Sequence, residues 1–153
     1  MNKFFKSIVL LLIAVLLIMQ FIRPEKNELG YESIVSFEKE TQPSDKVKSI
    51  LRNNCYDCHS NQTRYPWYAE IAPVSYWLAD HVEEGKEHFN VSQWENYSTK
   101  KKDHKLEELI EEVEEGEMPL ASYTWVHGNL KGEEKEILIE WTKNLRAKYT
   151  IKP

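Results

Sequence analysis

The sequence has 153 residues, of which 29% are charged and 41% hydrophobic, and its formal net charge is −5. This length allows one domain of ordinary size. The acidic balance argues against nucleic acid as a partner, because phosphate backbones are bound by an excess of lysine and arginine. Only two cysteines occur, with two residues between them, and a disulfide across so small a loop would stabilise the fold very little.

The first 26 residues have the pattern of an export signal. Lys3 and Lys6 precede a run from Ile8 to Ile22 that is apolar except for Gln20, and a basic start followed by an apolar run is typical of such signals. No small-residue cleavage site follows. We therefore expect residues 1–26 to be an uncleaved signal-anchor, a single-pass transmembrane helix of the cytoplasmic membrane with the rest of the chain on its periplasmic, extracytoplasmic side. A cleaved signal peptide is the alternative.

Residues 27–43 show no sustained hydrophobic period, and we interpret them as a linker. A helix is expected to begin at Ser44 or Asp45, because both residue types are good N-caps. The apolar residues of the stretch 47–51 recur at helical spacing after that cap. The same helix would end at the two cysteines.

Apolar stripes at helical spacing predict three further helices, and no strand alternation of any length is present. The fold class is therefore predicted to be all-α. We interpret the many glutamates of the second of these helices as a solvated face. The expected helices begin at Pro73 and end near Gly85, run from about Lys100 to Glu115 before Gly116, and span roughly Glu133 to Lys148; Ser92–Glu95 is a short turn, and Ala121–Lys131 a loop.

The two cysteines belong to the pentapeptide Cys-Tyr-Asp-Cys-His at positions 55–59. Covalent haem attachment, dithiol redox chemistry and zinc binding all use Cys-x-x-Cys, but only the first needs His59. In that chemistry the thiols of Cys55 and Cys58 add to the porphyrin vinyl groups, and His59 is the proximal iron ligand. A dithiol site would want a preceding strand, and zinc needs four ligands. His81 and His88 are too far apart in sequence for the usual finger.

A sixth iron ligand is most simply supplied by Met118, the one methionine outside the N-terminal segment. It lies between two predicted helices and is followed by Pro119, which stiffens the chain. A thioether ligand raises the reduction potential of haem iron. His127, in the same loop region, is the alternative, and His81 is a further rival.

Aromatic residues are frequent near the motif. Trp67, Tyr68 and Trp77 are candidates for packing on the porphyrin, although each could equally belong to the core. Arg64 is a candidate partner for a haem propionate.

Taken together, the chain resembles the haem-binding domain family of exported bacterial proteins, relatives of small single-haem cytochromes c. The resemblance implies a cytochrome c-like helical domain over residues 44–150, wrapped around one covalent haem c. It implies that the first and last helices pack together, with Leu51 and Trp141 as the candidate contact. Residues 81–96 have no counterpart in a minimal cytochrome c. The stretches that carry the resemblance are CYDCHSNQTRYPWY (55–68), IAPVSYWLADHVEEGKEHFN (71–90), SQW (92–94), GEMPLASYTWVH (116–127) and LKGEEKEILIEW (130–141).

These observations together predict a membrane-anchored, single-haem c-type cytochrome. It would transfer electrons outside the cytoplasmic membrane to unidentified redox partner proteins, and would be an electron carrier rather than an enzyme. The alternative is a haem-based sensor or peroxidase-like protein with an open or labile sixth ligand. Residues 1–26 carry a net charge of +3 out of the total of −5, which leaves −8 on the remainder. That charge permits a basic partner and serves solubility equally well.

Overall fold

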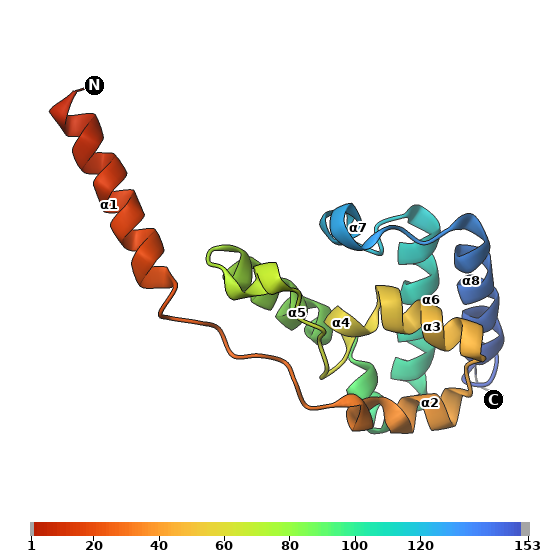
Figure 1. The fold of residues 1–153 in the computed structure, drawn as a ribbon. Coiled ribbons are helices and arrows are strands. Elements are labelled where there is room, and N and C mark those ends of the chain that lie inside the picture. The colour runs from red at the N-terminus through yellow and green to blue at the C-terminus, as the bar shows by residue number, and fades with distance from the viewer. Residues whose placement is uncertain (1, 151–153) are drawn as a thin grey trace.

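The computed structural model describes residues 2–150 (Figure 1). This part of the chain is all-α as predicted, and its only β-structure is one isolated antiparallel bridge between Glu28 and Gln62. The elements in order are α1 (Lys3–Met19), the 3₁₀-helix η1 (Tyr31–Ile34), α2 (Val35–Thr41), α3 (Asp45–Asn54), α4 (Tyr56–His59), η2 (Trp67–Glu70), α5 (Val74–His88), η3 (Val91–Asn96), α6 (Thr99–Glu115), α7 (Ala121–His127) and α8 (Gly132–Arg146).

The prediction of a transmembrane helix, and with it of a single-pass membrane protein, is wrong. Within residues 2–150, no helix combines the length and the apolarity that crossing a membrane requires. The apolar helix α1 has 17 residues. At 1.5 Å per residue it is about 25 Å long, less than the roughly 30 Å of a bilayer hydrocarbon core. The helix ends at Met19, before the apolar run does.

Just after α1, the chain bonds to the end of η2 and to the turn between η2 and α5. The side chain of Gln20 accepts a hydrogen bond from the Ala72 amide at 3.0 Å and donates one to the Ala72 carbonyl at 3.2 Å. Arg23 then forms an ion pair of 2.6 Å with Glu70. Further on, Asn27 donates from its side-chain amide to the Ser60 carbonyl at 2.8 Å. These contacts end the helix and lay the following segment along the loop that leads away from the cysteine motif.

The segment predicted to be a linker contains η1 and α2 and contributes to the core. Ile34 and Phe37 are 2% and 1% exposed, and Thr41 is also buried. These three positions have helical spacing. Because the third is a polar threonine, whose hydroxyl donates to the Phe37 carbonyl at 2.7 Å, the stripe is too short to be recognised by hydrophobicity alone.

The four longer helices of the domain follow the sequence pattern. Ser44 caps α3 by accepting from the Val47 amide, and Gly116 ends α6 in the left-handed conformation with φ of 82°. By contrast, α5 continues past Gly85 to His88, and the loop predicted over residues 121–131 contains α7. No residue of α7 is buried, which explains why it has no apolar stripe.

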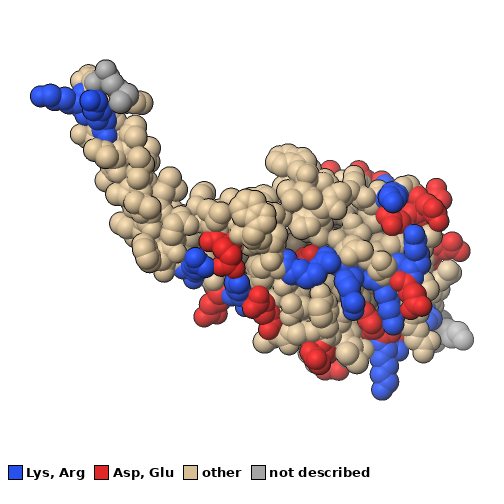
Figure 2. Space-filling view, in the orientation of Figure 1, with Lys and Arg blue, Asp and Glu red and all other residues tan. Residues whose placement is uncertain are grey.

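The core lies where α3, α6 and α8 pack together, with η3 and α2 closing it below. Leu51 and Trp141 belong to this one cluster, in which Leu51 is buried and Trp141 partly buried. The aromatic ring packed against Trp141 is that of Phe37, and their ring centroids are 6.4 Å apart. Figure 2 shows charges of both signs interspersed over the α6 and α8 side. There Arg146 pairs with Asp103 and Glu107 at 2.8 and 2.6 Å, as expected of a solvated face.

Candidate haem site

The cysteine motif forms a single helical turn that starts where α3 stops. Cys55 ends α3 with φ of −127° and ψ of −48°. Its carbonyl accepts hydrogen bonds from the amides of Cys58 and His59 at 3.2 and 2.9 Å. The intervening Tyr56 and Asp57 are 1% and 7% exposed. The turn therefore buries its two middle side chains and leaves both thiols and the imidazole half-buried at one surface.

His59 is held in one tautomer by α5. Its Nδ1 lies 2.9 Å from the Gly85 carbonyl oxygen and 3.0 Å from that of Phe89. Carbonyl oxygens only accept, so Nδ1 carries the hydrogen and Nε2 of the neutral ring keeps its lone pair. Burial lowers the pKa of His59, although the two carbonyls act against it. Among the described residues no hydrogen bond reaches Nε2, and this nitrogen is free to bind a metal.

Two adjoining cavities of about 250 Å³ each meet at His59. We call them the apolar lobe, which Cys55 lines, and the polar lobe, which Cys58 lines. The lobes share His59, Met118 and three further residues: Asn54, His88 and Pro119. The other walls of the apolar lobe include Leu51, Leu109, Val113, Leu130 and Leu138, and three charged residues of α6, Lys105, Glu108 and Glu112, also line it. The other walls of the polar lobe include His81, Glu84, Leu120 and Tyr123.

The donor set of this cleft fits a haem of the c type. One thiol stands in each lobe, an unprotonated imidazole nitrogen lies where the lobes meet, and a thioether lines both. Burial raises the pKa of Cys55 to about 12 and that of Cys58 to about 11. Redox-active cysteines are thiolates with lowered pKa values, which disfavours the dithiol alternative. Zinc needs four ligands, and among the described residues neither cysteine belongs to a cluster of three or more ligands whose donor atoms lie within 4.8 Å of one another.

The fold separates Met118 from His127, whereas His81 lines the polar lobe together with His59 and Met118. Met118 is half-buried against the core and lines both lobes with His59. His127 lines neither lobe; its Nε2 lies 2.8 Å from the Tyr68 hydroxyl, and its ring stacks on Tyr123 with centroids 4.2 Å apart. The structure thus brings Met118, and not His127, to the cavity of His59.

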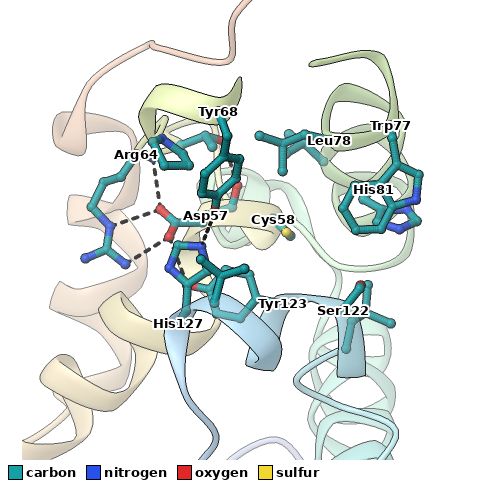
Figure 3. Close-up of a pocket in the computed structure, with 15 residues that line it drawn as sticks. Asp57, Cys58, Arg64, Tyr68, Trp77, Leu78, His81, Ser122, Tyr123 and His127 are labelled. Carbon is teal, nitrogen blue, oxygen red and sulfur yellow. Dashed lines mark hydrogen bonds and ion pairs between the residues drawn. The ribbon is translucent and has the colours of Figure 1, made fainter. Parts of the chain in front are cut away.

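The aromatic residues predicted to pack on the porphyrin lie elsewhere. Trp67 is 78% exposed and lines neither lobe. Tyr68 and Trp77 line a smaller cavity of about 60 Å³ on the far side of Cys58 (Figure 3). The aliphatic side chains of α6 and α8 form the apolar wall instead. Sequence patterns identify these side chains as core and do not distinguish core from cavity lining.

The Asp57 carboxylate accepts hydrogen bonds from two other segments, and sequence reasoning did not identify it. Its Oδ1 accepts from the backbone amide and Nε of Arg64 at 3.0 and 3.1 Å, and its Oδ2 from Nη2 at 2.9 Å. Oδ2 also accepts from the Tyr123 hydroxyl at 3.1 Å. Figure 3 shows Arg64 and Tyr123 reaching Asp57 from opposite sides. Arg64, predicted to meet a propionate, therefore neutralises the carboxylate inside the motif.

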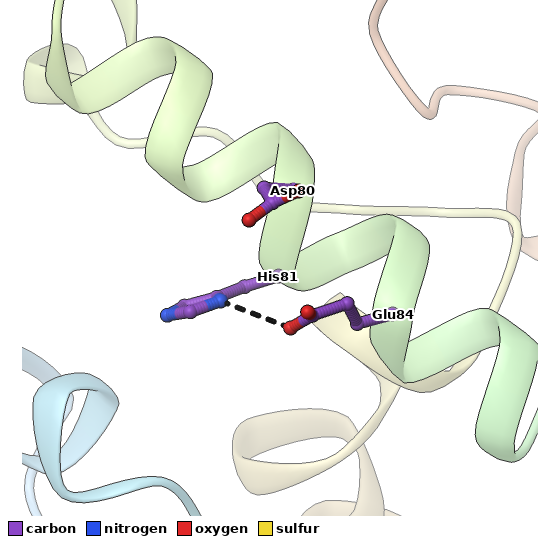
Figure 4. Close-up of side chains that lie close together, drawn as sticks. All are labelled: Asp80, His81 and Glu84. Carbon is purple, nitrogen blue, oxygen red and sulfur yellow. Dashed lines mark ion pairs between the residues drawn. The ribbon is translucent and has the colours of Figure 1, made fainter.

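His81, on α5, lines both of the cavities that Cys58 lines, the polar lobe and the smaller cavity of about 60 Å³. Its Nδ1 faces Glu84 Oε2 at 3.5 Å, and Asp80 stands within 4.8 Å of both (Figure 4). Both carboxylates are exposed, and all three residues come from one helix. Such groups are common on helix surfaces, so the trio does not by itself form a metal site.

Gly85 allows α5 to lie against the cysteine turn. A Cβ at this position would stand 2.7 Å from the Cys58 carbonyl oxygen and 3.0 Å from the Cys58 Cβ. The first of these is a backbone atom and cannot swing away. Sequence reasoning took this glycine as a helix end, because its packing partner lies 27 positions earlier in the chain.

We expect Gly85→Ala to destabilise the fold by about 1–3 kcal/mol, the usual cost of overpacking, although alanine is the better helix former. Urea unfolding followed by circular dichroism measures this loss. Gly132→Ala is the matched control, because nothing lies within 4 Å of the added Cβ at the start of α8. Equal stability of the two variants would contradict the close-approach argument.

Comparison with known proteins agrees with this site. The model of a family described as "Haem-binding domain" matches residues 14–144. No curated protein and no solved structure shows significant similarity to the chain. The matched range includes both cysteines, His59 and Met118, as well as the α5 carbonyls that hold His59.

Proposed function

The chain belongs to the haem-binding domain family, and on that premise we propose that it is a single-haem c-type cytochrome that carries electrons between partner proteins. When bound, the haem supplies an iron that exchanges one electron reversibly. The chain's own residues attach the group, hold the iron and exclude water. The observation that supports the proposal is that Cys55 and Cys58 line two adjoining cavities that share His59 and Met118 as walls.

Attachment is the role proposed for Cys55 and Cys58. Each thiol would hold the group through one thioether bond. Addition of S–H across a vinyl group would give that bond with the sulfur and the hydrogen both retained in the product, so no oxidant would be required. The cysteines are not bonded to each other, and their raised pKa values keep the S–H hydrogens in place at neutral pH. Each would anchor one edge of the group, because each lines a different lobe.

His59 and Met118 are proposed as the two iron ligands. The Gly85 and Phe89 carbonyls fix the imidazole with Nδ1 protonated, and such an outer hydrogen bond orients a ligand and raises its basicity. The thioether of Met118 would favour the reduced iron and raise the potential. The leucine and valine side chains that line the apolar lobe would limit access of water, which acts in the same direction.

An absorption spectrum of the haem-loaded protein tests this proposal. We expect a low-spin spectrum with a weak far-red band in the ferric state, as thioether ligation gives. Met118→Ala should abolish that band, while Met19→Ala, which changes a methionine at the end of α1, should leave it unchanged. A high-spin ferrous spectrum that shifts readily with carbon monoxide in the unsubstituted protein would instead favour a sensor or peroxidase-like haem protein.

A further inference from the structure

The helix after Met118 is held in place by polar contacts and not by apolar burial. None of the residues of α7 is buried, and Trp125 and Val126 are 83% and 63% exposed. Its Tyr123 hydroxyl lies 2.8 Å from the Asn53 carbonyl oxygen and 3.1 Å from Asp57 Oδ2. The second tether is the contact of 2.8 Å between His127 and the Tyr68 hydroxyl. Loss of the Tyr123 hydroxyl therefore removes one of the two polar tethers of this helix.

The Asp57 end of the Tyr123 tether is rigid. Asp57 is the second intervening residue of the cysteine motif, and its charge is neutralised by the Arg64 guanidinium. Its side chain is 9% exposed. Burial, and then the Asp57 carboxylate, raise the pKa of Tyr123, so that its hydroxyl stays protonated and acts as the donor at neutral pH. α7 is thus bonded directly to the turn that bears His59.

Tyr123 is also close to the proposed iron ligands in space. It lines the polar lobe together with His59 and Met118. Only four residues separate Tyr123 from Met118. One of them, Leu120, occupies the N-cap position of α7 and lines the same lobe. A displacement of α7 would therefore be transmitted through a very short piece of chain to the Met118 sulfur.

We propose that Tyr123 is a positioning residue that bonds α7 to the Asn53 carbonyl and the Asp57 carboxylate, which share its one hydroxyl hydrogen, and thereby holds Met118 in the cleft of His59. The inference rests on the proposed function, since it assigns Tyr123 a role in keeping the Met118 sulfur at the iron. It also gives a role to the ion pair between Asp57, which is buried inside the cysteine motif, and Arg64, which is exposed. An ion pair with one exposed partner adds little to stability in general, whereas here it gives Tyr123 a fixed acceptor.

Competition with free imidazole tests the proposal on the haem-loaded protein. Imidazole can bind the iron only when Met118 leaves it, so the apparent affinity for imidazole reports how firmly Met118 is held. Removal of one hydrogen bond in Tyr123→Phe should tighten apparent imidazole binding about three- to tenfold. The far-red band should also be lost at a lower temperature. The amount of haem that remains with the denatured chain should be the same in Tyr123→Phe as in the unsubstituted protein.

Tyr149→Phe is the matched control. It removes a tyrosine hydroxyl that donates to Glu40 Oε1 at 2.6 Å, and Tyr149 lines neither lobe. Its imidazole affinity should equal that of the unsubstituted protein. If Tyr123→Phe does not fold, Tyr68→Phe, which removes the other α7 tether, is expected to shift the affinity in the same direction. Unchanged imidazole affinity in a folded Tyr123→Phe protein overturns the inference. If Tyr123→Phe does not fold, unchanged affinity in Tyr68→Phe overturns it. Absence of the far-red band from the unsubstituted protein overturns the proposed Met118 ligation itself.

Discussion

Replacing Cys55 and Cys58 together by alanine is expected to abolish the haem that stays with the chain after denaturation. Thioether bonds survive acid-acetone extraction and denaturing electrophoresis, whereas coordination by His59 and Met118 does not. The chain has no other cysteine, so no second site can take over. The measurement is haem staining of the denatured protein, made in a host that matures cytochromes c.

The single variants provide the graded comparison for this result. Cys55→Ala keeps the Cys58 thiol in the polar lobe, and Cys58→Ala keeps the Cys55 thiol in the apolar lobe. Each should therefore retain stain, with an absorption maximum shifted by the one vinyl group that stays unsaturated. A double variant that keeps as much haem after extraction as the unsubstituted protein would refute covalent attachment.

The largest loss of stability is expected from Trp94→Ala. This side chain is 0% exposed, and its ring meets those of Phe37, Phe89 and Tyr149 with centroids 5.2, 6.2 and 5.8 Å apart. Truncating a buried tryptophan removes the transfer free energy and leaves a cavity, which together cost about 3–5 kcal/mol. Urea unfolding monitored by circular dichroism gives this free energy.

Trp125→Ala makes the same chemical change at a position that is 83% exposed. Exposed substitutions of this kind usually change the free energy of unfolding by less than about 0.5 kcal/mol. A Trp94→Ala loss below about 1 kcal/mol would mean that η3 contributes little to the core, contrary to the burial argument.

Local signals predicted the helices whose stripe and caps are complete. The α3 cap at Ser44 and the α6 end at Gly116 are examples. The short helices were missed for different reasons. α7 has no buried face, and in α2 the third buried position is Thr41. Neither helix has the apolar repeat on which a sequence-based assignment depends.

The site shows the same division between local and tertiary information. The motif and the position of Met118 point to one cleft, and the structure brings Cys55, Cys58, His59 and Met118 to its walls. Their roles as ligands and attachment points stay predictions. Asp57 and Gly85 could not be recognised beforehand, because their functions depend on partners from distant segments. The packing of Trp67, Tyr68 and Trp77 on the porphyrin also stays a prediction, although these side chains line neither lobe.

The position of α2 in the core bears on where the folding unit begins. Residues 27–30 are bonded along the chain that follows the motif: Thr63 donates its amide to the Asn27 carbonyl at 2.8 Å, and the Gly30 amide donates to Gln62 Oε1 at 2.8 Å. The family match likewise starts at residue 14, well before Ser44. We infer that a fragment cut at the helix cap of α3 would lose Ile34 and Phe37 from its interior. A fragment that keeps these contacts therefore starts at or before Asn27, and the pentapeptide is packed by segments that precede and follow it in the chain.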